Sequence, residues 1–146
     1  MIGGSRAATT IAAATLIVVG LASCTVGTGH RAGQLADRIG VSVPPGATRL
    51  AVDDPPGGGQ GSCSSLAFLL PRTEWKSYVG QYFSVDTLDK LDSVPGFCGH
   101  ALIDCDGGAL ATGFQASGDH RGLKRSLEVI PDCVDGQAKI AWGTTG

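Results

Sequence analysis

The sequence predicts an α+β fold, in which an antiparallel sheet of four to five strands carries one amphipathic helix on one face. Three observations indicate it. Residues 64–70 place Leu66, Phe68 and Leu70 on one side, as a half-buried strand does. Residues 72–83 repeat apolar side chains at helical spacing. The dipeptide Asp135-Gly136 separates two later strand-like segments and is a strong hairpin signal. Strands on both sides of one helix favour separate helix and sheet layers.

The first expected strand covers residues 48–52, where Leu50 and Val52 share one face, and it forms a hairpin with residues 64–70. The connection from Asp53 to Gly61 is rich in Asp, Pro and Gly, which are turn residues. We therefore interpret its carboxylates as turn chemistry and not as a ligand site.

The helix predicted over residues 72–83 has the clearest amphipathic pattern of the chain. Trp75, Val79 and Tyr82 recur at i, i+4 and i+7, with Tyr78 beside them. An aromatic stripe of this kind could be a carbohydrate platform. The chain has only two Trp, two Tyr and four Phe residues, however, so we expect these rings to form the core.

A second short helix is expected over residues 85–91, with Asp86, Asp89 and Asp92 on its solvated side. Asp104-Cys105-Asp106-Gly107 lacks the further ligands of a calcium loop and is interpreted as a turn. The basic cluster at residues 121–125 is interpreted as a solvated loop or strand edge. Three further strands are expected over residues 109–116, 123–130 and 139–142.

The N-terminal segment has the layout of a secretory signal. Arg6 precedes an uncharged run from Ala7 to Ser23, and small residues then lead into Cys24. Leu21-Ala22-Ser23-Cys24 resembles the lipobox of bacterial lipoprotein precursors. The resemblance implies that the Cys24 sulfur receives a diacylglyceryl group, that a peptidase cuts before Cys24, and that the protein is lipid-anchored on the extracytoplasmic face of the cell membrane.

This organisation divides the chain into three parts. Residues 1–23 form the signal peptide, and residues 24–43 form the lipidated Cys24 with a flexible tether, which includes a short helix from Arg31 to Ile39. Residues 44–146 form a single disulfide-stabilised α+β domain, a size that suits one core. The alternatives for the first segment are a plain cleaved signal and an uncleaved anchor helix, although its strongly apolar part is short for a membrane span.

The lead-in Pro44-Pro45-Gly46-Ala47-Thr48 and the junction Leu70-Pro71-x-x-Glu74-Trp75 are similar to those of small uncharacterised exported lipoproteins of high-GC Gram-positive bacteria. The resemblance covers about half of the mature chain. It implies secretion and the outline of the fold, and it implies no activity, substrate or catalytic residue.

The remaining cysteines, Cys63, Cys98, Cys105 and Cys133, are even in number, which predicts two disulfides in an exported chain. If the strands near Cys63 and Cys133 are antiparallel neighbours, both cysteines reach the same end of the sheet, which favours Cys63–Cys133 with Cys98–Cys105. The alternative pairing is Cys63–Cys98 with Cys105–Cys133. A metal site at Cys98 and His100 is the competing interpretation, but no Cys-x-x-Cys pair supports it.

The sequence argues against several classes of function and leaves two hypotheses. A net charge of −2 argues against a nucleic-acid partner. Nucleophile-elbow, Ser-x-x-Lys and zinc-protease motifs do not occur, and no cofactor is indicated. Ser117, Asp119 and His120 have the residue types of a triad, but neighbours within one glycine-containing loop are weak evidence for one. The favoured hypothesis is a non-catalytic domain that presents a sheet face or loop to an envelope protein or a ligand. The alternative is a small envelope hydrolase with His100 or His120 as base.

Overall fold

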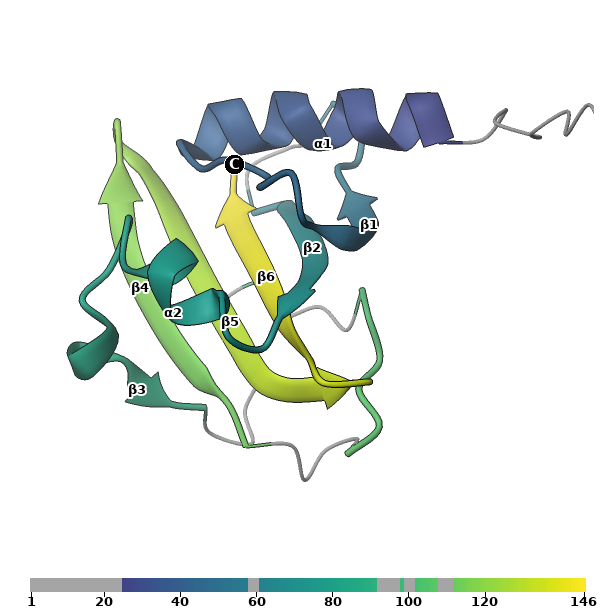
Figure 1. The fold of residues 1–146 in the computed structure, drawn as a ribbon. Coiled ribbons are helices and arrows are strands. Elements are labelled where there is room, and N and C mark those ends of the chain that lie inside the picture. Colours follow the sequence, from purple (N-terminus) through teal and green to yellow (C-terminus); the bar gives the residue numbers. More distant parts are fainter. Residues whose placement is uncertain (1–24, 58–60, 92–97, 99–101, 108–111) are drawn as a thin grey trace, which may run out of the picture.

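The computed structural model describes residues 25–57, 61–91, 98, 102–107 and 112–146, and within them one antiparallel sheet of six strands carries the fold (Figure 1). The strand order is β1-β2-β6-β5-β4-β3. The strands are β1 (Thr48–Asp53), β2 (Cys63–Pro71), β3 (Asp89–Lys90), β4 (Phe114–His120), β5 (Leu123–Val134) and β6 (Gln137–Thr145). The helices are α1 (Thr25–Ile39), α2 (Trp75–Val79) and the short 3-10 helix η1 (Val85–Thr87).

Tight hairpins build the centre of this sheet. Asp135 and Gly136 both have positive φ and join β5 to β6, which confirms the predicted hairpin. Arg121 and Gly122 also both have positive φ, and they join β4 to β5. The basic cluster therefore begins in a hairpin turn. The sheet is antiparallel as predicted.

The expected strands differ from the observed ones mainly at their ends. The predicted hairpin of residues 48–52 and 64–70 is confirmed as β1 paired with β2. Strands β5 and β6 extend several residues beyond the expected ends. Strand β4 begins at Phe114, and residues 109–111 of the expected strand lie outside the described part. In place of a helix over residues 85–91 the chain forms η1 and then β3, because Asp89 and Lys90 pair with β4.

One side of the sheet, which we call the helix-covered face, holds the main core. Side chains of alternate residues on β2, β5 and β6 meet α1 and α2 there. Trp75, Tyr78 and Val79 are buried in this core, which confirms the expectation that the aromatic residues pack inside. The strand residues that define this face are Leu66, Phe68, Leu70, Leu127, Val129, Ala138, Ile140 and Trp142.

Helix α1 is longer and more firmly packed than the expected tether. It runs from Thr25 to Ile39, and Leu35 and Ile39 are fully buried against the sheet, with Ala32 and Ala36 beside them. The expected helix from Arg31 to Ile39 is confirmed, whereas a flexible segment was the wrong expectation for residues 25–30. Packing onto the core stabilises a helix whose glycines alone would disfavour it. No helix of the described residues is long and apolar enough to cross a membrane.

Helix α2 is shorter than the predicted helix over residues 72–83. It covers Trp75–Val79, and Gly80 is its C-cap. The chain continues in turns that keep Tyr82 and Phe83 beside Trp142. The aromatic side chains thus reach the core without a continuous helix.

The disulfide prediction was right in kind and wrong in pairing. The observed bridges are Cys63–Cys98 and Cys105–Cys133, with Cα–Cα distances of 5.4 and 4.4 Å. The favoured pairing of Cys63 with Cys133 fails because β6 lies between β2 and β5. Both strands are antiparallel to β6 and so run parallel to each other. The start of β2 and the end of β5 consequently lie at opposite ends of the sheet.

Candidate functional site

The side of the sheet opposite the helices, which we call the polar face, is defined by Ser65, Gln115, Ser117, Ser126, Glu128 and Lys139. The strand register aligns one row across four strands. Ser65 of β2 pairs with Gly143 of β6, Gly143 pairs with Ser126 of β5, and Ser126 pairs with Ser117 of β4. Directly paired residues point to the same side of a sheet. Two hydroxyl groups therefore flank one glycine, and a third stands on the next strand.

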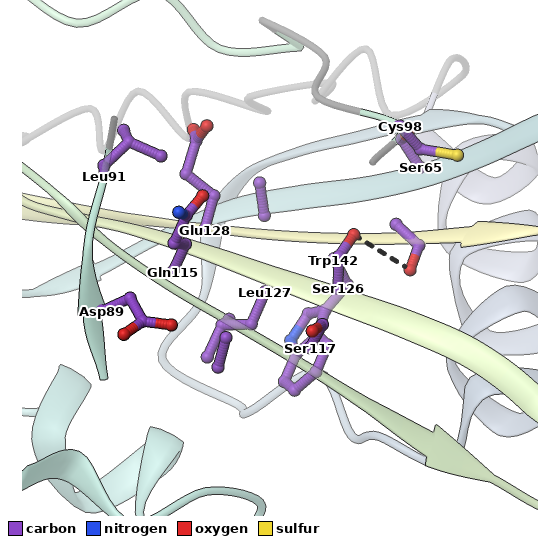
Figure 2. Close-up of a pocket in the computed structure, with 13 residues that line it drawn as sticks. Ser65, Asp89, Leu91, Cys98, Gln115, Ser117, Ser126, Leu127, Glu128 and Trp142 are labelled. Carbon is purple, nitrogen blue, oxygen red and sulfur yellow. Dashed lines mark hydrogen bonds between the residues drawn. The ribbon is translucent and has the colours of Figure 1, made fainter. Parts of the chain in front are cut away.

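The next row combines small and polar residues. Ala141 of β6 pairs with Glu128 of β5, Glu128 pairs with Gln115 of β4, and Gln115 pairs with Asp89 of β3. Because Gly143 and Ala141 have little or no side chain, β6 forms a low floor between taller neighbours. The result is a hollow of about 200 Å³, which we call the polar hollow. Figure 2 shows Asp89, Gln115 and Glu128 toward one end, and Ser65 and Cys98 toward the other.

The Cys63–Cys98 disulfide forms one wall of the polar hollow. A Cβ at Gly143 would lie 3.1 Å from Cys98 Cβ and 3.0 Å from Ser126 Oγ, so only glycine leaves room for this wall. Ser126 donates a 3.4 Å hydrogen bond to the Gly143 carbonyl oxygen, and Cys98 Sγ lies 3.2 Å from the Thr144 carbonyl oxygen. The bridge thus fixes Cys98 directly above the floor of the hollow.

Ser65 is the least satisfied polar residue of the hollow. It is 3% exposed, and its Oγ has no hydrogen-bond partner among the residues that the structure describes. Buried hydroxyls in native proteins nearly always have a partner, so an unpartnered one requires an explanation. Since Ser65 lines the polar hollow, a bound molecule could supply the missing hydrogen bond.

The electrostatic character of the polar hollow is acidic. Glu128 Oε1 lies 2.6 Å from Lys139 Nζ in an ion pair, and the Lys139 side chain is only 6% exposed. Asp89 is exposed at the rim. Among the described residues that line the hollow none is basic, and Lys139 is not one of them. The lining therefore offers carboxylate, amide and hydroxyl groups, and of its two carboxylates Asp89 is the one without an ion-pair partner among the described residues.

The helix-covered face differs in that its buried tyrosine hydroxyl and tryptophan indole groups have partners, although Arg125 Nε has none among the described residues. Tyr78 donates its hydroxyl to the Ser42 carbonyl oxygen at 2.9 Å and accepts a 3.0 Å hydrogen bond from Trp142 Nε1. Burial, and then the neighbouring Tyr82, raises the pKa of Tyr78, so its hydroxyl keeps its proton. These groups fasten the core and leave no opening for a ligand between them.

Arg125 is the exception to the expectation of a solvated basic cluster. Its guanidinium lies 5.5 to 5.7 Å from the ring centres of Tyr82, Phe83 and Trp142. It donates hydrogen bonds of 2.9 and 3.0 Å to the carbonyl oxygens of Ile39 and Gly40, at the C-terminal end of α1. Arg125 is thus a structural clamp on α1, whereas Arg121 and Lys124 are exposed as expected.

The loop after β1 also has a structural role. Asp54 accepts hydrogen bonds from Arg38 Nη2 at 2.6 Å and from Ser64 Oγ at 2.7 Å, while Arg31 donates to the Asp54 carbonyl oxygen at 2.8 Å. Partial burial raises the pKa of Asp54, but these hydrogen bonds and the nearby arginines together hold it below its usual value. This carboxylate joins the loop to α1, in agreement with its interpretation as loop chemistry.

The residues suggestive of a triad do not converge. Ser117, Asp119 and His120 belong to β4 and not to a loop. Ser117 and His120 lie on opposite faces of the sheet, because they are an odd number of residues apart. The His120 ring packs against Gly40. His100 lies outside the described residues.

The metal interpretation finds no support within the described part of the chain. All four cysteines after Cys24 are in disulfides, and no group of three His, Cys, Asp or Glu side chains there could hold a metal ion. Cys24, the candidate lipidation residue, and the predicted signal peptide of residues 1–23 lie outside the described residues.

Sequence reasoning missed the polar hollow. Its signal was the polar half of each strand's alternation, in Ser65 and in Gln115, Ser126 and Glu128. From the sequence alone these polar positions are typical of an ordinary solvated face, because only the strand order brings their side chains together near Gly143. Comparison with protein-family models, with curated proteins and with solved structures found no match for this chain.

Proposed function

We propose that this chain is an extracytoplasmic lipoprotein, anchored through a diacylglyceryl group on Cys24, whose domain binds a partner or ligand at the polar hollow without catalysing a reaction. The observation that carries the binding role is the unpartnered hydroxyl of Ser65, buried in the wall of an open hollow. The lipid anchor is supported by the lipobox-like sequence from Leu21 to Cys24.

The position of α1 adds to this proposal. The helix begins at Thr25, directly after Cys24, and among residues 27–39 Ala32 is the first that is buried in the core. At about 1.5 Å of rise per residue, a lipid on Cys24 would hold the domain roughly 10 Å from the membrane surface. A partner of the polar hollow would then be met close to the bilayer. No observation in the described residues favours the hydrolase alternative.

The binding role is tested by titrating the full chain, in non-ionic detergent and with both disulfides intact, with a library of small polar fragments. Amide NMR shifts are followed on both faces. We expect saturable shifts at Gln115, Ser117 and Ser126 and recovery of the fragments unchanged. Shifts confined to α1 and α2, or turnover of a fragment, would contradict the proposal.

The anchor is tested separately by mass spectrometry of protein taken from the membrane fraction. We expect the mass of a diacylated Cys24 at the mature N-terminus, and we expect Cys24→Ala to leave the chain unacylated and either uncleaved or released. An unmodified Cys24 in the mature wild-type protein would refute the lipid anchor and leave the binding role standing.

A further inference from the structure

We propose that the ligand of the polar hollow is a small molecule with an ammonium group and several hydroxyl groups, of the chemical class of the amino sugars. This inference rests on the proposed function, and it names the chemistry that the same hollow recognises. Three features carry it: the charge of the lining, the arrangement of its hydroxyl groups, and the size of the hollow.

The charge of the lining selects against anions. Asp89 and Glu128 lie on either side of Gln115 in one row, and strands are about 4.8 Å apart, so about 10 Å separates the backbones that carry the two carboxylates. Lys139 pairs with Glu128 from outside the lining, and no basic residue is found among the described lining residues. Because Lys139 compensates the charge of Glu128, an anionic ligand would meet the negative charge of Asp89, whereas an ammonium group would be attracted to it.

The hydroxyl groups select a ligand that can both donate and accept hydrogen bonds. Ser65 and Ser117 stand in the first row, and the Gln115 amide stands in the second. Because Ser65 Oγ is buried and unpartnered, a ligand hydroxyl at its position gains a hydrogen bond without displacing one within the protein. Hydroxyl groups next to an ammonium group match this sequence of partners along the hollow.

The size of the hollow suits a single small ring. Its volume of about 200 Å³ corresponds to the liquid volume of roughly seven water molecules. This is below the usual range for drug-sized ligands, so one monosaccharide-sized molecule is the natural occupant.

The test compares three sugars that share one ring and differ in charge: glucosamine, glucose and glucuronate. The full chain in non-ionic detergent is titrated at near-neutral pH and low salt, and binding is followed by calorimetry and by the melting temperature. We expect glucosamine to bind saturably and raise the melting temperature, glucose to bind about tenfold more weakly, and glucuronate not to bind.

Two variants with a matched control locate the contacts. Asp89→Asn should weaken glucosamine binding about tenfold and leave glucose binding unchanged. Asp86→Asn, an exposed carboxylate of η1 outside the hollow, should change neither. Ser65→Ala should weaken binding of both sugars yet raise the melting temperature of the ligand-free protein, because it removes a buried hydroxyl that has no partner.

Several results would overturn the inference. Glucuronate binding as tightly as glucosamine, or no binding of any of the three sugars to correctly folded wild-type protein, would reject the ligand class. Glucosamine binding that survives both Asp89→Asn and Ser65→Ala would reject this site. If the fragment library still shifts the polar face while the sugars do not bind, the proposed function stands and only the amino-sugar class is wrong.

Discussion

The same strands form both faces of the sheet, but the two faces differ in how their buried polar groups are satisfied. On the helix-covered face, two helices close over a core in which Tyr78 and Trp142 satisfy each other's polar groups. On the polar face, a glycine floor keeps a hollow open, and a buried hydroxyl, that of Ser65, lacks a partner. Natural proteins commonly depart from complete polar satisfaction where they function. The polar face also carries a smaller apolar cluster that includes Leu69, Ile130 and Cys133, so we assign the main core to one face and the binding site to a part of the other.

The largest test of this comparison removes the centre of the helix-covered face. Trp142 is 1% exposed and contacts Tyr82 and Phe83. Trp142→Ala should lower the free energy of unfolding by about 3–5 kcal/mol, since it leaves a large cavity and frees the Tyr78 hydroxyl. Urea denaturation measures this change. On the polar face, Gln115→Ala should cost less than about 0.5 kcal/mol. Equal losses in both variants would contradict the division of roles.

The second test opens the wall of the polar hollow. Removing the Cys63–Cys98 bridge as Cys63→Ser with Cys98→Ser releases a link across 35 residues, which the chain-entropy model places near 4 kcal/mol, with measured values of about 2–5 kcal/mol. We expect a lower urea midpoint and weaker ligand binding. Non-reducing peptide mapping of the wild type should yield Cys63 joined to Cys98, and a Cys63–Cys133 peptide would contradict the structure.

These cysteines show where prediction from the sequence ends. The strands, the Asp135-Gly136 hairpin and the aromatic core follow from local patterns, because alternation and turn chemistry lie within a few neighbouring residues. The order of the strands in the sheet does not follow from such local patterns. Placing β6 between β2 and β5 reverses the relation of Cys63 to Cys133, and nothing near either residue encodes that placement.

The first turns of helix α1 and the polar hollow were not predicted from the sequence, for a related reason. Gly27 and Gly29 made residues 25–30 resemble a tether, but a Cβ at either of them would meet no atom within 4 Å, so these glycines lie outside the packed stripe. The hollow likewise depends on pairing across strands. Ser65 and Ser126 approach one another only because both pair with Gly143.

The third test fills the floor of the polar hollow. In Gly143→Ala the new methyl group would press on Cys98 and Ser126, at a cost of about 1–3 kcal/mol, and would reduce the space for a ligand. The control is Gly33→Ala on the exposed side of α1, where the methyl meets nothing and a better helix former should add about 0.5–1 kcal/mol. Thermal denaturation distinguishes the expected loss of stability in Gly143→Ala from the expected gain in Gly33→Ala. If Gly143→Ala is neutral and binds ligand normally, the floor does not shape the hollow.

The smallest test compares two neighbouring serines that point to opposite faces. Ser64 donates its hydroxyl to Asp54, whereas Ser65 has no partner. Ser64→Ala should therefore destabilise the protein by about 1 kcal/mol, while Ser65→Ala should be neutral or stabilise the ligand-free protein by a similar amount. Thermal denaturation of both variants without ligand measures the contrast, and a loss of stability in both would mean that Ser65 has a structural partner.

The pH dependence of Ser64→Ala sharpens the same contrast. The pKa of Asp54 is held below its ordinary value of 3.8 in the folded protein, so its contribution to stability is fully present above that pH and is lost as the pH falls through the lower folded value. Since the Arg38 side chain is 45% exposed, the contribution is modest. Ser64→Ala and Asp54→Asn should each cost stability at neutral pH and approach wild-type stability in acid, whereas the effect of Ser65→Ala should not change over that range. A Ser64→Ala deficit that stays constant in acid would show that the hydroxyl acts independently of the Asp54 charge.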